Sequence, residues 1–382
     1  MFNAEEKERY SRQILLDSFG EEGQLKLNKA SVLVIGAGGL GCPALTYLAA
    51  AGIGHIGIMD HDIVELSNLH RQTLYSTSDI GKKKVTVAAE KLLSINPDLK
   101  ISTFDFSLDP ANALEIIRDY DIVIDGTDNL HARYIVNDAC ALLCKAWVYG
   151  SVYKFEGQVA LFNFVLSNGA RSADYRSLFP EPPPASSVAS CNESGVIGVV
   201  PALIGILQAT ECIKYLSIQS SENTGKLFCY NALSLSFENF EISRNAVADA
   251  NRPNSFEAFR KMNYEEYCIG KADARYEIEP QELISLLVDQ ELEIFDIRES
   301  DELSPLKGID AKHLPYSSLD ILQFDHKEGR PLVFICQRGI RSKKLIDKLR
   351  AKNIKGVFYS LKQGAEGWTI MKQEHNIEQE IR

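Results

Sequence analysis

The sequence has no excess of basic residues. Its 382 residues include 41 lysines and arginines against 52 aspartates and glutamates, which gives a formal net charge of -11. Nucleic acids and anionic membranes are bound by surfaces rich in positive charge. We therefore expect neither a nucleic-acid partner nor a membrane partner.

Long apolar runs are also missing. No stretch of about 18 apolar residues appears, so no membrane span is expected. The N-terminus is charged and polar and lacks the apolar core of a signal peptide. The eight cysteines are scattered and mostly lie in apolar runs, which favours reduced thiols, most of them in the core. These absences predict a cytoplasmic protein.

Short strands and helices alternate along the first part of the chain. After a helical arm over residues 1–25, we predict strands at 31–35, 55–60, 100–104 and 121–125, with helices ending at 51 and spanning 83–95 and 111–119. A β-rich stretch at 146–165, an exposed proline-rich connection within 178–190, an apolar helix at 198–216 and a hairpin at 226–243 follow. This alternation predicts an α/β fold with a doubly wound, mostly parallel sheet.

A second and smaller alternation begins near residue 275. We predict strands at 293–297, 331–335 and 356–359 and a helix at 343–352. Residues 245–275 are polar and irregular, which favours an interdomain region. The sequence therefore predicts two domains, residues 1–270 and 271–382, the second a compact α/β domain.

A glycine-rich loop follows the first predicted strand. Gly36 permits a tight turn, Gly38 lets phosphate oxygens approach the backbone, and Gly41 lets helix and strand pack closely. Asp60 ends the next strand, at the distance where an acidic side chain accepts from a ribose hydroxyl. Alone, this pattern fits a nicotinamide dehydrogenase equally well.

The residues after Asp60 favour a triphosphate. Arg71 and the lysines at 82–84 add positive charge near the glycine loop. Asp128 follows a predicted strand at the sheet edge where such folds bind ligands, and a carboxylate there suits Mg²⁺. The alternative interpretation makes the lysines a solvated helix start and Asp128 a helix N-cap.

Near the other end of the chain, an apolar strand stops at Cys336. Gly339 and two arginines, Arg338 and Arg341, follow before a lysine-rich helix. Helix N-terminal amides and guanidinium charge both stabilise a thiolate. Read alone, this loop fits a phosphatase, a redox sensor or a sulfur-transfer enzyme.

Four motifs resemble the MoeB/ThiF adenylyltransferases, the bacterial family similar to ubiquitin-activating enzymes. They are residues 9–13, 36–41, 68–72 and 126–129, and the likeness covers residues 1–270. The resemblance implies a homodimer that uses ATP and Mg²⁺ to adenylate the C-terminal glycine of a ubiquitin-like sulfur carrier of the MoaD/ThiS kind. The pathway stays open among molybdopterin, thiazole for thiamine, cysteine and tRNA thiolation.

The resemblance also implies roles for individual residues. The nucleotide-binding set is Gly36, Gly38, Gly39, Gly41, Asp60, Asn68, Arg71, Gln72, Lys84, Asp128 and Asn129. Within it, Arg71 and Asp128 count as catalytic, and Asp128 would hold Mg²⁺. Arg12 would be an arginine finger that reaches into the partner subunit, and Cys191 matches the position of a reactive cysteine in some members.

The sequence departs from the family pattern at the structural zinc site. Family members bind zinc through two C-x-x-C pairs, but the four matching positions here are Asp174, Ser177, Ala248 and Asn251. A tetrahedral zinc site needs four good ligands. We therefore expect no structural zinc.

The region around Cys336 resembles a rhodanese domain over residues 275–372. The six-residue loop from Cys336 to Arg341 has the length found in sulfurtransferases. The resemblance makes Cys336 a catalytic persulfide carrier that receives sulfur from a donor such as a cysteine desulfurase. Asp296 and Arg298 are expected to form a structural pair beneath the loop.

The sequence is therefore compatible with three functions. The first is carrier adenylation followed by sulfur transfer from Cys336 to give a thiocarboxylate. The second is a nicotinamide-dependent oxidoreductase with a redox cysteine, which leaves Arg12, Arg71 and the Cys336 loop unexplained. The third is a scaffold that binds a carrier without catalysis, which the intact Asp128 and Cys336 disfavour.

Overall fold

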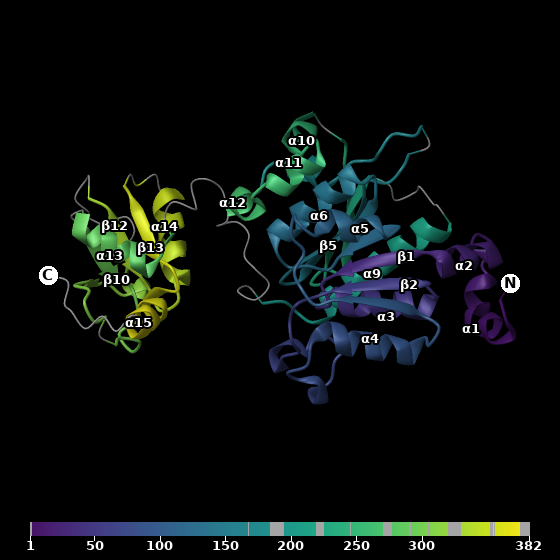
Figure 1. Cartoon of the computed structure of the whole chain (residues 1–382), viewed down its shortest axis with the longest axis horizontal. Coiled ribbons are helices and arrows are strands. Elements are labelled where there is room, and N and C mark those ends of the chain that lie inside the picture. The colour runs from purple at the N-terminus through teal and green to yellow at the C-terminus, as the bar shows by residue number, and fades with distance from the viewer. Residues whose placement is uncertain are drawn as a thin grey trace. The chain divides into compact units, whose positions relative to one another are not determined.

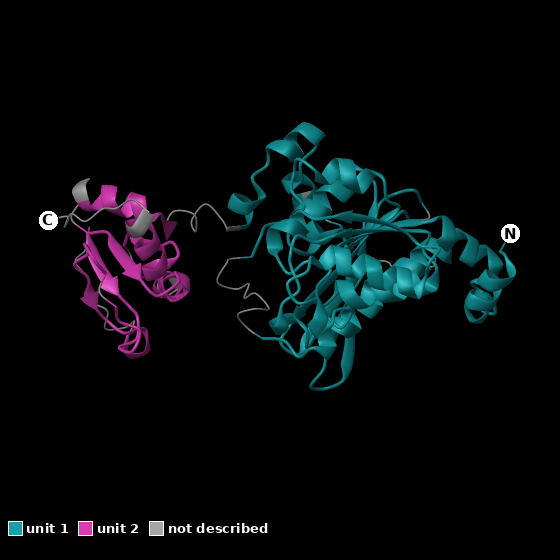
Figure 2. Cartoon of the chain, turned by 60° about the horizontal axis from the view of Figure 1, so that its bottom comes forward, with its two compact units in different colours: residues 1–183, 189–268 teal, residues 184–188, 269–382 magenta. Residues whose placement is uncertain are grey.

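The computed structural model describes residues 2–166, 168–183, 195–218, 225–244, 246–269, 277–289, 292–304, 306–319, 330–351, 354 and 356–374. These residues divide into two compact units. Unit 1 contains the described residues up to 268, and unit 2 contains those from 269 onward (Figure 2). The boundary predicted from the sequence lies at 270/271.

Unit 1 is built on one eight-stranded sheet (Figure 1). The strand order is β3 (Lys100–Phe104), β2 (His55–Met59), β1 (Ser31–Ile35), β4 (Ile122–Asp125), β5 (Ala146–Tyr153), β6 (Glu156–Phe162), β7 (Lys226–Asn231) and β8 (Ser236–Glu241). The strands from β3 to β5 are parallel, and β6 to β8 extend the sheet with antiparallel pairing. The predicted doubly wound, mostly parallel sheet is confirmed.

Helices cover both faces of this sheet because the side chains of each strand alternate between them. In β1, Val32 and Val34 join one core, and Leu33 and Ile35 join the other. The first core includes residues of α2 (Gly20–Lys29), α3 (Gly41–Ala51), α4 (Lys84–Ile95) and α9 (Val199–Ser217). The second includes residues of α5 (Ala113–Arg118), α6 (Leu130–Leu142), α7 (Tyr175–Leu178), α11 (Phe256–Lys261) and α12 (Tyr264–Ile269).

Helix α9 is long and apolar enough to cross a membrane by length and composition alone. It instead packs into unit 1, where Ile204, Ala209 and Cys212 belong to the core between α9 and the sheet. Its Gln208 is fully buried and donates to the carbonyl of Asp125 at 2.6 Å. Helix α9 is therefore a core helix of unit 1.

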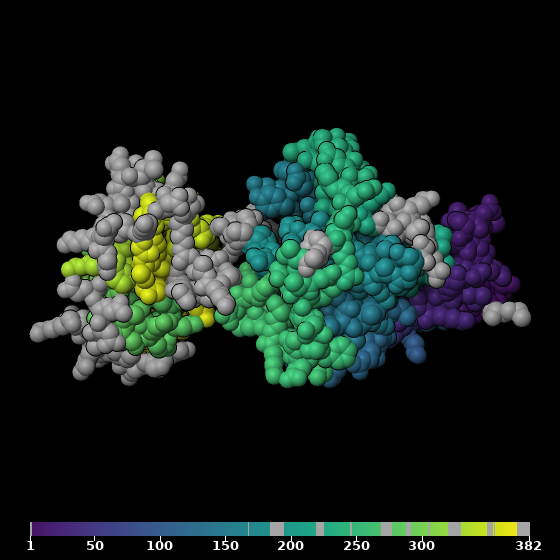
Figure 3. Space-filling model, turned by 90° about the horizontal axis from the view of Figure 1, so that it is seen from above, coloured from purple at the N-terminus to yellow at the C-terminus, as the bar shows by residue number. Residues whose placement is uncertain are grey.

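The expectation of an irregular interdomain region over 245–275 is wrong for residues 246–269. They form α10 (Ala246–Asn251), α11 and α12, which belong to unit 1 up to Cys268. Phe259 and Tyr264 are buried in the second core. The surface of residues 225–269 covers a broad part of unit 1 in Figure 3. The sequence signal was weak because each helix is only six residues long and contributes few apolar side chains.

Unit 2 contains a five-stranded parallel sheet. Its order is β11 (Lys312–His313), β10 (Glu293–Asp296), β12 (Leu332–Ile335), β13 (Phe358–Leu361) and β9 (Glu277–Ile278). α14 (Ile340–Ala351) packs on one face, and α13 (Pro280–Asp289) and α15 (Gly364–Glu374) pack on the other. Helix α14 begins at Ile340 rather than at the predicted Lys343, so Arg341 lies in its first turn.

The remaining helices are α1 (Ala4–Ile14), next to α2 at the N-terminus, and the short 3₁₀ helices η1 (Leu66–Asn68), η2 (Thr77–Asp79) and η4 (Tyr316–Ser318). Helix α1 is capped by Asn3, which accepts from the Glu6 backbone while Glu6 accepts from Asn3. The predicted proline-rich connection is described only up to Pro183, and its remainder lies outside the described residues.

Candidate functional site

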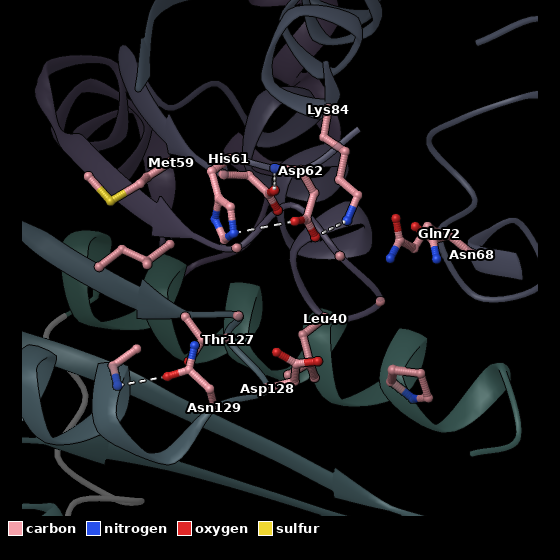
Figure 4. A pocket seen from close by; sticks show the side chains of 18 of the residues that line it. Leu40, Met59, His61, Asp62, Asn68, Gln72, Lys84, Thr127, Asp128 and Asn129 are labelled. Atoms are coloured by element: carbon pink, nitrogen blue, oxygen red, sulfur yellow. Dashed lines mark hydrogen bonds and ion pairs between the residues drawn. The ribbon is translucent and has the colours of Figure 1, made fainter. Parts of the chain in front are cut away.

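A cavity of about 720 Å³ opens at the carboxyl ends of β1, β2 and β4 (Figure 4). The chain runs from β1 outward to β3 on one side and resumes at β4 on the other, so β1 and β4 flank a topological switch point. Ligands of open α/β sheets bind at this place. Ten predicted residues line the cavity: Gly36, Gly38, Gly39, Asp60, Asn68, Arg71, Gln72, Lys84, Asp128 and Asn129.

Of Gly36, Gly38 and Gly41, only Gly38 has room for a Cβ atom. Gly36 has a φ of +91°, and a Cβ there would lie 2.6 Å from the carbonyl oxygen of Gly126. A Cβ on Gly41 would lie 1.9 Å from the carbonyl oxygen of Gly36, so Gly41 serves packing and does not line the cavity. A Cβ on Gly38 would meet only the Gln72 side chain, at 3.5 Å. Backbone at Gly38 is therefore approachable from the cavity.

Asp60 is held in place by backbone amides. Its Oδ2 accepts from the N–H of Ala37 at 2.7 Å, and its Oδ1 accepts from the N–H of Asp62 at 2.8 Å. The first bond ties the end of β2 to the glycine loop after β1. Each carboxylate oxygen keeps a further lone pair for a ligand hydroxyl.

The cationic and amide groups come from the segment after β2. Lys84 is 4% exposed, and its Nζ lies 2.8 Å from Oδ2 of the exposed Asp62. Arg71 donates to the carbonyl of Ser67 at 3.0 Å. Gln72 is 4% exposed, and its Oε1 has no hydrogen-bond partner among the described residues. A buried acceptor without a partner is costly, so a donor from a ligand is favoured there.

The sequence left open whether Asp128 binds a ligand or caps the helix that follows it. The side chain of Asn129 caps α6 by accepting from the N–H of Ala132 at 2.8 Å, so the N-cap is Asn129 and the alternative that made Asp128 the cap is wrong. Asp128 is exposed and lines the cavity. Its carboxylate is therefore available to a ligand.

The loop that carries Asp128 rests on a buried ion pair. Asp125 accepts from the backbone and hydroxyl of Thr127 at 2.9 and 2.6 Å, and from Nε of Arg133 at 3.2 Å. Burial raises the pKa of the Asp125 carboxyl, against the opposing effect of Arg133. The Arg133 guanidinium also lies 5.1 Å from the ring centre of Tyr149. These contacts fix the turn after β4.

Sequence reasoning missed several cavity residues, among them His61. Its Nε2 lies 3.4 Å from Oδ1 of Asp62, and its Nδ1 lies 3.1 Å from the hydroxyl of Ser107. Phe106 and His131 also line the cavity. Their positions in the sequence could have indicated them, because His61 directly follows Asp60 and because Phe106 and Ser107 follow β3 at the same sheet edge.

Cys336 directly follows β12 and is 1% exposed. Its Sγ lies 3.4 Å from the hydroxyl of Ser342, which in turn lies 2.7 Å from the hydroxyl of Ser360. Gly339 has a φ of +82°, a conformation that suits glycine. A Cβ on Gly364 would lie 2.1 Å from the carbonyl oxygen of Cys336, so the loop packs closely on the start of α15.

Both arginines of the Cys336 loop are paired with carboxylates. Nη2 of Arg341 lies 2.6 Å from Oε2 of Glu302, and Nε of Arg338 lies 3.1 Å from Oε1 of Glu366. The sequence-based interpretation gave both guanidiniums to the thiolate alone, which leaves out these partners. The carboxylates hold the pKa of Arg341 above its usual value, although burial opposes the shift.

The expected pair between Asp296 and Arg298 is confirmed. Arg298 is 1% exposed, and its Nε and Nη2 donate to the two carboxylate oxygens of Asp296 at 2.9 and 2.7 Å. The guanidinium also donates to the carbonyl of Ser304 at 2.8 Å. The pair closes the turn after β10.

Most other cysteines behave as core residues. Cys42, Cys140, Cys212 and Cys268 are buried. Burial raises the pKa of the Cys42 and Cys268 thiols to about 12. Cys191 lies outside the described residues, so its predicted role stays a prediction.

The four positions that match the family zinc site lie on α7 and α10. Asp174 caps α7 by accepting from Ser177 N at 3.1 Å, and it forms an ion pair with Arg252. Asn251 donates to the carbonyl of Pro180 at 3.1 Å. Polar contacts thus join the α10 segment to the α7 segment.

Arg12 lies on α1 and is exposed. It does not line the cavity of its own chain. Its predicted role as an arginine finger would therefore need a second copy of the chain.

Comparison with known proteins covers both units. The model of the ThiF family matches residues 10–250. The "Sulfur carrier protein adenylyltransferase" of Thermus thermophilus is 48% identical over 241 residues, 63% of this chain and 89% of that protein. The "Probable adenylyltransferase/sulfurtransferase MoeZ" of Mycobacterium tuberculosis is 35% identical over 378 residues, 97% of this chain and 94% of that protein.

Among solved structures, the chain is similar to E. coli MccB crystallised with ATP. The TM-score is 0.54 at 23% identity, over 64% of this chain and 74% of that one. This likeness supports the fold of unit 1. With the family model matching well over half of the sequence, the chain belongs to the ThiF family.

Proposed function

We propose that the protein is an adenylyltransferase and sulfurtransferase that acts on a ubiquitin-like sulfur carrier. The observation that carries the proposal is the presence of two sites on one chain, a nucleotide-type cavity in unit 1 and a buried cysteine loop in unit 2. A relative named for both activities matches the chain over nearly its whole length. A relative matched over unit 1 is named for sulfur carrier adenylation.

In the first step, the C-terminal carboxylate of the carrier attacks the α-phosphorus of ATP, and pyrophosphate leaves. Asp60 would accept from the ribose hydroxyls, and the backbone at Gly38 would receive phosphate oxygens. Arg71 and Lys84 would neutralise phosphate charge, which requires the Lys84–Asp62 ion pair to open. Activation is needed because a free carboxylate resists attack by sulfur.

The residues at the cavity suit Mg²⁺. The exposed carboxylate of Asp128 is an oxygen ligand of the kind that Mg²⁺ shares with phosphates. When bound, the ion would neutralise charge on the departing pyrophosphate. Arg12 from the second copy of a homodimer would add positive charge at the same cavity.

In the second step, Cys336 carries a persulfide whose terminal sulfur attacks the acyl adenylate and releases AMP. We propose a cysteine desulfurase as the upstream donor. If the thiolate of Cys191 then attacks the sulfur of Cys336, the carrier leaves as a thiocarboxylate and a Cys191–Cys336 disulfide remains. A thiol reductant must reopen that disulfide. All of these partners fit a cytoplasmic enzyme.

Pyrophosphate exchange tests the adenylation step. We expect ATP–pyrophosphate exchange in the presence of a carrier encoded beside the gene, with a loss of at least about 100-fold in Arg71→Ala. No exchange with any such carrier, and no loss in the variant, would contradict the proposal.

Mixing two inactive variants tests the dimer. Arg12→Ala and Asp128→Ala should each lose exchange, and mixed dimers should regain part of it because one of the two cavities then has both residues. Equal inactivity in a mixture whose subunits exchange would refute an arginine supplied by the partner.

A further inference from the structure

We infer that three carboxylates around the Cys336 loop select the sulfur donor, so that Cys336 takes sulfur from thiol persulfides and discriminates against dianionic donors such as thiosulfate. The inference rests on the proposed sulfurtransferase role and names the residues that select the donor at that site. It starts from the position of Cys336, which is 1% exposed. A donor sulfur must pass the side chains of the loop to reach it.

The carboxylates cancel the positive charge of the loop. Arg341 is paired with Glu302 at 2.6 Å and approaches Glu299 at 3.9 Å, and Arg338 is paired with Glu366 at 3.1 Å. Two guanidinium charges therefore face three carboxylate charges. An approaching dianion meets a local field that is negative on balance.

The two carboxylates nearest Arg341 are fixed by other bonds. Oε2 of Glu302 accepts from the N–H of Glu299 at 2.8 Å. The carboxylate of Glu299 accepts from the N–H and the hydroxyl of Ser317 at 3.0 and 2.7 Å. To pair with an arginine of the loop, a thiosulfate ion would have to displace a carboxylate that the fold already holds in place. The arginine would then lose one ion pair as it formed another, so the exchange gives no net gain in ion pairing.

Glu366, on α15, is fixed by contacts with the residues that follow Cys336. It accepts from Gln337 Nε2 at 3.2 Å as well as from Arg338. Its own backbone N–H donates to the carbonyl of Gln337 at 3.2 Å. The loop and the start of α15 therefore present Glu366 next to the residues that follow Cys336.

The two donor classes differ in charge but not in the bond that changes. With a persulfide RS–SH, the Cys336 thiolate attacks the terminal sulfur, the S–S bond breaks, and RS⁻ leaves as Cys336 becomes a persulfide. With thiosulfate, the same attack on the outer sulfur releases sulfite. Neither reaction needs an external oxidant or reductant. Charge repulsion during approach therefore decides between them.

Neutralising one carboxylate at a time tests the inference on the full chain. Glu302→Gln and Glu366→Gln keep the shape of the side chain and remove its charge. Glu293→Gln is the matched control, because Glu293 lies at the opposite end of β10 and pairs with Lys312 at 3.5 Å. Sulfite release from thiosulfate and sulfur loading of Cys336 by cysteine persulfide, measured by mass spectrometry after alkylation, are the two readouts.

We expect each loop variant to react with thiosulfate about 5- to 10-fold faster at low ionic strength, with less gain in about 0.5 M salt. Loading by cysteine persulfide should change less than about 2-fold, because that donor carries less charge. An unchanged thiosulfate rate in both variants, or an equal rise in Glu293→Gln, would overturn the inference while leaving the sulfurtransferase role intact. Failure of the native chain to load Cys336 from either donor would overturn both.

Discussion

The buried ion pair between Arg176 and Asp138 gives a quantitative test of how unit 1 is held together. Both side chains are fully buried. Nε and Nη2 of Arg176 donate to the two carboxylate oxygens of Asp138 at 2.7 and 2.6 Å, and Nη1 donates to Tyr267 Oη at 2.6 Å. Tyr264 donates to Asp138 at 2.8 Å. The network joins α6, α7 and α12.

Replacement of Arg176 by Met should lower the free energy of unfolding of unit 1 by about 3–5 kcal/mol, because Asp138 would remain as a buried charge without its cation. The double variant Arg176→Met, Asp138→Asn should recover part of this loss, since no charge is then stranded. The exposed pair between Lys261 and Glu257 supplies the control: Glu257→Gln should cost less than about 1 kcal/mol.

Urea unfolding followed by tryptophan fluorescence measures these changes. The chain has two tryptophans, Trp147 in unit 1 and Trp368 in unit 2. In a Trp368→Phe background, the signal therefore reports unit 1 alone. A loss below about 1 kcal/mol in Arg176→Met, or a double variant less stable than the sum of both single changes, would refute the reasoning.

Three further predictions concern the cavity and α10. Gly41→Ala should abolish ATP binding and lower the melting temperature, because its Cβ would lie 1.9 Å from the Gly36 carbonyl oxygen. Gly38→Ala should keep the melting temperature and weaken only ATP binding in calorimetry, because its Cβ would make only an ordinary contact with the Gln72 side chain at 3.5 Å. Asp128→Asn should leave thermal stability unchanged, because Asp128 is exposed. The variant should need a higher Mg²⁺ concentration for pyrophosphate exchange, and an unchanged Mg²⁺ dependence would contradict the role of Asp128 as a Mg²⁺ ligand. Hydrogen bonds from Arg244 lower the pKa of Asp249. The pair therefore stabilises the fold above the ordinary carboxyl pKa, and this stabilisation is lost as the pH falls through the lowered pKa. Asp249→Asn should lower the free energy of unfolding by about 0.5 kcal/mol near neutral pH and should reduce the dependence of that free energy on pH in the acid range.

Much of the nucleotide cavity could be predicted because its signals are local in sequence. A buried strand followed by Gly36 to Gly41 and a helix specifies a strand–turn–helix within about 20 residues. Asp60 and Asp128 follow two other strands of the same parallel sheet. Parallel strands bring their carboxyl ends to one edge, so the sheet assembles residues that are far apart in the chain.

Other features depended on partners that are distant in sequence. Glu302 and Glu366 lie 39 and 28 residues from the arginines that they bind. Tyr264 reaches Asp138 across 126 residues. No local pattern marks such pairs, because a surface carboxylate and an ion-pair partner look alike in sequence.

The sequence by itself determined the two-part organisation, the α/β alternation and the strand–loop–helix settings of Gly36 and Cys336, since backbone conformation and side-chain periodicity act over a few residues. Only the tertiary structure decided that Asn129 caps α6, that residues 246–268 belong to unit 1, and that both arginines of the Cys336 loop pair with carboxylates. These outcomes follow from competition among long-range contacts, in which burial and charge pairing select one partner from many of the same chemical type.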